Sequence, residues 1–370
     1  MEPFSQMAHP HTKNGHPKNM LRLVAWEVTR SCNLNCVHCR ASAEKGPYPG
    51  ELATDKCLEI LDQIASIGKP TVILTGVEPL LREDIFELSR HGTQLGLRMV
   101  MATNATLLTP EIAQKMKSSG IQRVSVSLDR ATAAKHDQFR KVPGAFEGTL
   151  AGVEILKKAG IEFQVNTTVT KHNVHEVQEI LDMVIDLGAV AHHIFLLVPT
   201  GRAKDMVNQE IDAQAYEKLL HWFYHVGKEV PIHLKATCAP HYYRILRQEA
   251  HKKGEKVNFE TYGLDAVTRG CLGGISFCFV SHEGIVQPCG YLELNSGDLT
   301  KSSFGEVWEK SEKFNQLRNF SSYKGKCGQC EYIRVCGGCR ARAFEATGDY
   351  MQEEPLCMYQ PAKALRSEAP

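Results

Sequence analysis

The chain has 370 residues, of which 43% are hydrophobic, and its formal net charge is +1. This length allows one large domain and a smaller one, and the apolar share is sufficient for a buried core. A charge near zero gives no indication of a nucleic-acid partner or of an anionic membrane surface. No apolar run approaches the ~18 residues of a membrane span. We expect residues 1–20 and 362–370 to be tails, the first of them disordered.

The cysteine content is high, because thirteen cysteines occur in the chain and most stand in short-spaced groups. The number is odd, and the N-terminus has no recognisable secretion signal. Both observations favour metal ligation over disulfide bonds. We therefore expect a protein of the reducing cytoplasm.

From about Leu21 to Leu197 the sequence alternates β-branched apolar runs with amphipathic helices that end near glycine. Six runs are predicted to be strands: Leu23–Thr29, Thr71–Leu74, Arg98–Ala102, Arg123–Leu128, Phe163–Val169 and Ala191–Val198. Alternating strands and helices predict a parallel sheet. Six uninterrupted units favour a barrel or partial barrel over an open sheet. Ile232–Lys235 is a candidate for a further strand.

Three cysteines follow the first strand with the spacing C-x3-C-x2-C: Cys32, Cys36 and Cys39. A [4Fe–4S] cube normally takes four thiolates, so three cysteines suggest a cube with one open iron. Half of a structural zinc site and a set of ordinary thiols are the alternatives.

Other polar or unusual residues also stand directly after predicted strands. They include Gly76, Val77 and Glu78 after the second strand, Asn104 after the third, Asp129 after the fourth, Thr168 at the end of the fifth and Arg202 after the sixth. In a βα barrel the carboxyl ends of all strands meet at one face, where active sites are built. The sequence therefore predicts one site assembled from segments about 170 residues apart.

A second set of cysteines occupies the C-terminal quarter. Its members are Cys271, Cys278, Cys289, Cys327, Cys330, Cys336, Cys339 and Cys357. Eight thiols suffice for two cubes, whereas the paired C-x2-C spacing is also typical of structural zinc. Cys57 and Cys238 stand alone in the sequence, and we expect them to be structural.

The first cysteine motif, with His38 at its aromatic position, resembles the signature of the radical S-adenosylmethionine (SAM, AdoMet) enzymes. The resemblance implies a partial (βα)6 barrel of the TIM type. It implies that Cys32, Cys36 and Cys39 hold a cluster whose open iron binds SAM. Cleavage of SAM then gives a 5′-deoxyadenosyl radical that abstracts hydrogen from the substrate.

The same resemblance implies contacts with SAM. Glu78, in a stretch similar to the family's G-G-E-P motif, would bind the SAM amino group. The residues that match further SAM-contacting positions are His38, Gly76, Val77, Asn104, Ser127, Asp129 and Thr168. Arg202 would meet a carboxylate of SAM or of the substrate.

The C-terminal cysteines resemble the SPASM extension of this superfamily, which binds auxiliary [4Fe–4S] clusters. This implies a barrel over residues 21–235, a linker over 236–270 and a cluster domain over 271–361. An auxiliary cluster can either ligate the substrate or take up an electron.

Longer stretches, such as Phe195–Arg202 and Cys336–Ala343, resemble the branch that contains anaerobic haem b synthases, which decarboxylate Fe-coproporphyrin III. The implied reaction turns two propionates into vinyl groups, with ferredoxin or flavodoxin as the electron donor. The cations available to the propionates are Arg22, Arg40, Arg140 and Lys171. Alternatives are a didecarboxysiroheme or haem d1 pathway enzyme, a peptide maturase, or a degenerate non-catalytic Fe–S protein.

Three residues depart from the superfamily pattern, because glycine is usual where this chain has Val77, Ala105 and Arg130. Glycine is used where φ is positive or where a ligand approaches the backbone. If Val77 needs such a conformation, we expect strain of roughly 1–3 kcal/mol beside the SAM pocket.

Overall fold

The computed structural model describes residues 20–362 and contains one continuous sheet of ten strands in the order β10-β9-β8-β1-β2-β3-β4-β5-β6-β7. The first seven strands are parallel to their neighbours. They are β1 (Leu23–Glu27), β2 (Thr71–Thr75), β3 (Arg98–Thr103), β4 (Val124–Ser127), β5 (Phe163–Val169), β6 (Ala191–Leu196) and β7 (His233–Thr237). The six predicted strands and the further strand are confirmed. Most of the predicted N-terminal and C-terminal tails lies outside the described residues.

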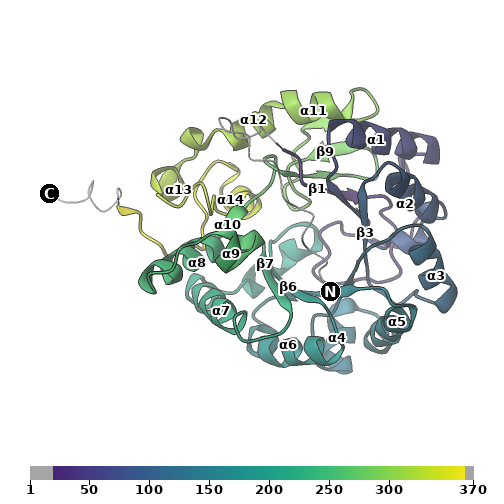
Figure 1. The fold of residues 1–370 in the computed structure, drawn as a ribbon, viewed down its shortest axis with the longest axis horizontal. Helices are drawn as coiled ribbons and strands as arrows, with labels where there is room; N and C mark the ends of the chain where they lie inside the picture. The colour runs from purple at the N-terminus through teal and green to yellow at the C-terminus, as the bar shows by residue number, and fades with distance from the viewer. Residues whose placement is uncertain (1–19, 363–370) are drawn as a thin grey trace.

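Helices connect these strands and form a ring outside them (Figure 1). They are α1 (Thr54–Ile67), η1 (Pro79–Leu81), α2 (Ile85–Gln94), α3 (Pro110–Ser118), α4 (Ala133–Arg140), α5 (Ala145–Ala159), η2 (Val174–Glu176), α6 (Val177–Asp186), η3 (Gly201–Gln209) and α7 (Ala213–Val226). The start of α3 illustrates the local rules. Thr109 accepts a hydrogen bond from the Ile112 amide at 3.2 Å, and Pro110 takes the first helical position.

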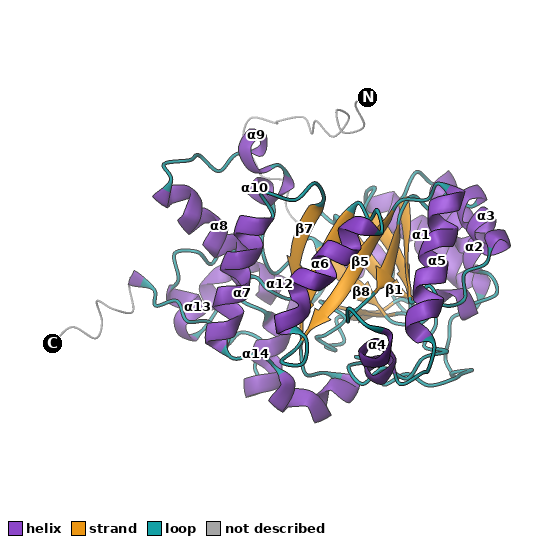
Figure 2. Ribbon diagram, turned by 90° about the horizontal axis from the view of Figure 1, so that it is seen from below, coloured by secondary structure: helices purple, strands orange, loops and turns teal. Residues whose placement is uncertain are grey.

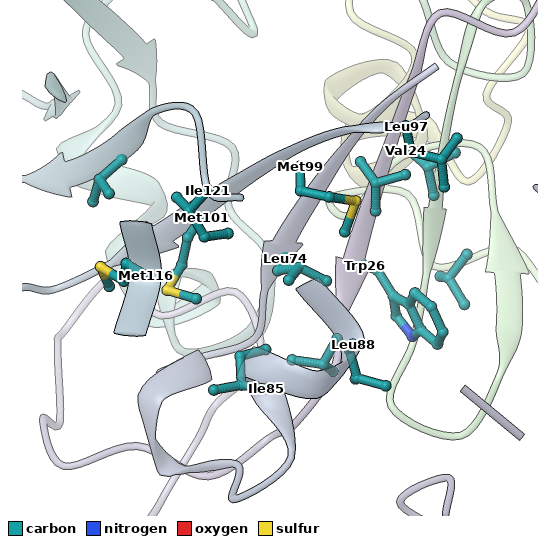
Figure 3. Packing of buried hydrophobic residues seen from close by; sticks show 14 of the residues in the cluster. Val24, Trp26, Leu74, Ile85, Leu88, Leu97, Met99, Met101, Met116 and Ile121 are labelled. Atoms are coloured by element: carbon teal, nitrogen blue, oxygen red, sulfur yellow. The ribbon is translucent and has the colours of Figure 1, made fainter. Parts of the chain in front are cut away.

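The core lies between the strands and this helical ring. Trp26, Leu74 and Met99 are fully buried on neighbouring strands, and they face Ile85 and Leu88 of α2 (Figure 3). Removal of this apolar surface from water is the main driving force for closing the sheet.

The C-terminal region extends the same sheet. In it, β8 (Phe277–Val280) pairs in parallel with β1, and β9 (Ile285–Gln287) and β10 (Gly297–Asp298) add antiparallel strands. Its helices are α8 (His241–Lys252), α9 (Phe259–Tyr262), α10 (Leu264–Val267), α11 (Phe304–Lys310), α12 (Glu312–Arg318), η4 (Phe320–Ser322), α13 (Gly325–Gln329) and α14 (Arg340–Thr347). Figures 1 and 2 show that these segments fill the side of the ring between α8 and α1.

The barrel is therefore partial, as predicted, and its gap is occupied by the C-terminal region rather than by further strand–helix units. Among residues 20–362, no helix is long and apolar enough to cross a membrane.

Candidate active site

The loop between β1 and α1 gathers the three cysteines of the first motif. Cys32 and Cys36 are buried in one packed group, and Cys39 contacts the same group. Burial raises the pKa of Cys32 to about 12, and the neighbouring thiols of Cys36 and Cys39 add to this rise. Backbone amides donate to two of the sulfurs, from Leu34 to Cys32 at 3.2 Å and from Ala43 to Cys39 at 3.5 Å. Such bonds stabilise thiolates, the form that binds iron.

Segments from the far side of the barrel hold this loop in place. The backbone amides of Asn35 and Val37 donate to the carbonyls of Arg140 and Phe139 at the end of α4. Arg202 donates from Nε to the Cys36 carbonyl at 2.9 Å and from Nη1 to the Ala43 carbonyl at 2.6 Å. Arg202 thus braces the cysteine loop, and its predicted contact with a ligand carboxylate stays a prediction.

Glu78 lies directly after β2 and is completely buried. Its carboxylate accepts hydrogen bonds from the Thr103 hydroxyl at 2.7 Å and from the Asn104 amide at 2.8 Å, and the Leu80 amide adds a third. None of these partners carries a charge. Burial therefore prevails and raises the pKa of Glu78 to about 7. A ligand ammonium group would supply the positive charge that this carboxylate lacks.

The backbone around Glu78 explains why residue 76 is a glycine. A Cβ added at Gly76 would lie 2.5 Å from the carbonyl oxygen of Thr29, so only glycine allows this approach to the end of β1. Val77 is not among the residues with positive φ. It packs against the cysteine group, and its amide donates to the Thr29 carbonyl at 3.1 Å. The strain considered for Val77 is therefore not present.

The left-handed conformation occurs instead at Ala105, whose φ is 67°. Ala105 follows Asn104, which donates through Nδ2 to Asn33 of the cysteine loop at 2.8 Å. The turn thus places the Asn104 amide on Glu78 and the Asn104 side chain on the cysteine loop. Alanine pays a modest conformational cost here that glycine would avoid.

Asp129, predicted to contact SAM, is buried and already paired within the chain. One carboxylate oxygen accepts from the Thr168 amide at 2.8 Å, and the other pairs with the guanidinium of Arg140. Burial alone would raise the pKa of Asp129, but Arg140 holds it below its usual value. Arg140 also donates to the sulfur of Cys36 at 3.4 Å, so it links the carboxylate to a cluster cysteine.

Two further predicted residues are near this pair. His38 stacks on Phe139 with ring centroids 4.4 Å apart, and burial lowers its pKa to about 4. Its ring is therefore neutral at pH 7. Ser127 ends β4 and is half-buried.

The guanidinium of Arg130 lies 6.0 Å from the ring centroid of Phe139, on which His38 stacks. It donates to the His172 carbonyl and pairs with Glu176 at 3.4 Å, both on the segment after β5. The three departures from the superfamily pattern thus leave the neighbourhood of Glu78 and the cysteine loop intact.

The C-terminal cysteines divide into two groups. Four of them line one cavity: Cys327, Cys330, Cys336 and Cys357. In a second group, Cys289 and Cys339 pack together, and the charge of Cys271 influences both.

Cys238 belongs with the second group, although it stands alone in the sequence. It packs against the same residues as Cys289 and Cys339. Burial raises its pKa well above the usual value, and the thiols of Cys339, Cys289 and Cys271 contribute to the rise. Sequence spacing gives no signal for this, because about 30 residues separate Cys238 from Cys271.

Cys278, predicted to be a ligand, lies elsewhere. It is fully buried in β8, where it pairs with Val24 of β1 and belongs to the main hydrophobic core. In a strand, alternate side chains face opposite sides, and this position faces the apolar interior.

Among the described residues, no three His, Cys, Asp or Glu side chains converge closely enough to hold one metal ion. A four-iron cube has a different requirement, because each thiolate binds its own corner iron.

Residues 26–184 match the radical SAM superfamily, and residues 271–340 match the SPASM iron-sulfur cluster-binding domain. An AdoMet-dependent heme synthase of Nitratidesulfovibrio vulgaris is 56% identical over 92% of this chain and 93% of that protein. One from Methanosarcina barkeri is 55% identical over 93% of this chain and 98% of that protein. Streptococcus suis SuiB bound to S-adenosylmethionine has a similar fold, with a TM-score of 0.73 at 17% identity over 92% of this chain and 78% of that chain.

The fold and the cysteine loop define an iron–sulfur enzyme of the radical type. The chain belongs to the radical SAM superfamily, to its SPASM-containing group, and within that group to the family of the AdoMet-dependent haem synthases. The cofactors of this class are [4Fe–4S] clusters and S-adenosylmethionine. The residues fit both, since the loop offers three thiols and Glu78 is a buried carboxylate without a cation.

Proposed function

We propose that the enzyme converts two propionate side chains of Fe-coproporphyrin III to vinyl groups and so produces haem b. The observation that carries this proposal is the identity above 50% with AdoMet-dependent haem synthases over nearly the whole chain. The site supports it, because the cysteine loop and Glu78 meet at the carboxyl ends of β1 and β2.

The bound cofactors supply a reagent strong enough to remove hydrogen from an unactivated carbon. The chain's own residues position that reagent. Glu78 would hold the ammonium group of SAM, while the Arg202 bonds to Cys36 and Ala43 fix the cysteine loop. The burial of Cys32 and Cys36 excludes water from the reaction.

Each conversion removes one hydrogen atom from the β-carbon of a propionate and releases the carboxylate as CO2. A vinyl group and one electron remain. The electron needs an acceptor, and the C-terminal cysteine groups are suited to hold one.

A polar cavity of about 210 Å³ lies beside the cysteine loop, lined by Glu27, Arg30, Arg40, Phe279, Ser281, Glu283, Ile285, Gln287, Glu293 and Asn295. It is smaller than a typical whole-ligand pocket of about 300–1,000 Å³, so it suits a side chain rather than a macrocycle. Of the four cations predicted for the propionates, Arg40 lines this cavity, where it also pairs with Glu27 at 2.7 Å. Because of this position Arg40 is our candidate partner for a propionate, which would share the guanidinium with Glu27.

We further propose a small reduced protein such as ferredoxin or flavodoxin as the electron donor, in the cytoplasm. The support is chemical, since this many free cysteines persist as thiols only in reducing surroundings.

The test is a turnover assay with anaerobically reconstituted protein, SAM, a strong reductant and Fe-coproporphyrin III, followed by mass spectrometry. We expect haem b, a monovinyl intermediate and 5′-deoxyadenosine. Formation of 5′-deoxyadenosine without any change in the porphyrin would disprove this substrate and leave only the enzyme class. In that case a didecarboxysiroheme, haem d1 precursor or peptide substrate would be tested next.

A further inference from the structure

Cys238 follows β7 at the mouth of the barrel and has an unusual backbone. Its φ is 55°, in the left-handed region that residues other than glycine rarely occupy. Side chains from two other elements hold this conformation. The Tyr216 hydroxyl donates to the Cys238 carbonyl at 3.3 Å, and both terminal nitrogens of Arg342 donate to it at 3.4 Å. Strained conformations that the surroundings enforce concentrate at functional sites.

Arg342 connects Cys238 to the cysteines of the cluster domain. It is buried in α14 and pairs with Glu354, whose carboxylate accepts from the Cys339 amide at 2.6 Å. It also donates to the Leu197 carbonyl at the end of β6 at 2.9 Å. The guanidinium of Arg342 thus fixes the backbone at the barrel mouth. Through Glu354 it also fixes the backbone of Cys339. Partners of this kind orient metal ligands.

The two C-terminal groups then contain four cysteines each. Cys238 and Cys289 pack with Cys339 around Val198 and Leu292. Cys271 lies near enough that its thiolate would raise the pKa of these three thiols. The amide of Cys271 donates to the Cys336 carbonyl at 3.1 Å, which places the second group directly beside the cysteine-lined cavity. Cys278 is excluded from both groups because its side chain is part of the core between β8 and β1.

We propose that Cys238 is a ligand of the auxiliary [4Fe–4S] cluster nearer the barrel, together with Cys271, Cys289 and Cys339, and that Cys278 is not a ligand. The other auxiliary cluster takes Cys327, Cys330, Cys336 and Cys357. Each cube then has one thiolate per iron and no open iron. It follows, on the basis of the proposed decarboxylation, that the nearer cluster accepts the released electron without binding a propionate.

The test starts from a chain in which Cys32, Cys36 and Cys39 are alanine, so that only the auxiliary clusters remain. Iron and sulfide are counted after anaerobic reconstitution, and electron paramagnetic resonance (EPR) spectra are recorded. The parent should hold about 8 iron atoms per chain. Cys238→Ala should lower this to about 7, with a [3Fe–4S] signal, or to about 4 if the whole cube is lost. The matched control Cys278→Ala should keep about 8.

A ligand role is separated from a packing role by a pair of nearly isosteric variants. Cys238→Asp should restore the iron and shift the EPR spectrum, because a carboxylate can bind iron, whereas Cys238→Asn should not. A packing role predicts the opposite order, since a buried charge is costlier than an amide. Full iron with an unchanged spectrum in Cys238→Ala, or iron loss in Cys278→Ala, would overturn the assignment.

The absence of an open iron has its own measurement, which does not depend on turnover. Cyanide binds an open iron and changes the spectrum of the reduced cluster. We expect no change in the spectrum of the parent chain. If Cys238→Ala retains all four irons of this cube, we expect its spectrum to change. A cyanide-dependent spectrum in the parent would refute the complete ligand set, whatever the outcome of the porphyrin assay.

Discussion

Glu78 combines complete burial with uncharged hydrogen-bond partners, so its ionisation should govern SAM binding. Its pKa is raised to about 7, so the carboxyl is largely neutral below that pH and ionised above it. Only the ionised form pairs with an ammonium group. We therefore expect the affinity for SAM, measured by anaerobic calorimetry, to fall about tenfold per pH unit below pH 7.

Two variants check this explanation. Glu78→Gln should weaken binding by about 10- to 100-fold, the value of a charge-assisted hydrogen bond, and should remove the pH dependence. The nearby exposed Glu83→Gln should leave both unchanged. Wild-type binding that is independent of pH between 5 and 8 would contradict the role given to Glu78.

Arg140 and Asp129 form a buried ion pair whose members depend on each other. Arg140→Met leaves Asp129 as an uncompensated buried charge, and we expect a loss of about 3–5 kcal/mol in the stability of the cluster-free protein. Adding Asp129→Asn should recover most of that loss. Denaturant unfolding of the two single variants and the double variant measures this coupling, and simple additivity would argue against the pair.

At the residue scale, the sequence indicated candidate ligands where they share a local motif, and it gave no signal for Cys238, the ligand that we propose. Glu78 and the first three cysteines could be found because each lies in a short spaced pattern. Cys238 could not, since only the fold brings it to Cys289 and Cys339. Cys278 was predicted to be a ligand because eight C-terminal cysteines suffice for two cubes. The sequence alone does not distinguish a structural cysteine in a strand from a ligand.

The helix α5 approaches the site more closely than its sequence suggests. A Cβ added at Gly152 would lie 2.3 Å from the carbonyl oxygen of Ala105, within the turn that carries Asn104. We expect Gly152→Ala to destabilise the protein by about 1–3 kcal/mol through this clash. One turn earlier, an added Cβ at Gly148 would lie 3.3 Å from the Thr106 methyl and 3.4 Å from the Thr106 Cβ, and the nearest backbone atom would be 3.7 Å away.

Gly148→Ala is therefore the control. It should be neutral or stabilising by up to about 1 kcal/mol, because alanine favours the helix. Thermal unfolding of both variants, together with SAM binding, tests the difference. Equal stability of the two would show that α5 is not in tight contact with the turn.

At the element scale, the six strand–helix units could be predicted because each has its own periodic signal and terminal glycine. The addition of β8 to the same sheet could not. Phe277–Val280 is a run of only four residues, one of them Cys278, and its partner β1 is about 250 residues away. No local pattern encodes such a pairing.

Across the whole molecule, Arg342 joins the cluster region to the barrel through Leu197, Cys238 and Glu354. Arg342→Met would leave the buried carboxylate of Glu354 without this charged partner, and we expect a loss of about 3–5 kcal/mol in the free energy of unfolding. We expect faster limited proteolysis between the barrel and the cluster region. The exposed Arg334→Met should be cleaved like the wild type, and equal rates for both variants would contradict this role.

Glu27 makes a second connection of this kind. It pairs with Arg40 of the cysteine loop at 2.7 Å and with His282 after β8 at 2.9 Å. Burial opposes its ionisation, yet these partners lower its pKa to about 2. A carboxyl whose pKa is lowered on folding stabilises the protein at pH values above its pKa in the unfolded state. This contribution is lost as the pH falls toward 2.

The pairing of β1 with β8 also bears on how the chain is made. During synthesis, one edge of β1 emerges early and stays unpaired until Phe277–Val280 has left the ribosome. Contacts this distant in sequence form slowly, and unpaired strand edges invite association with other chains. The nascent protein thus carries an aggregation-prone edge for most of its translation, which would make its yield depend on chaperones and on growth temperature.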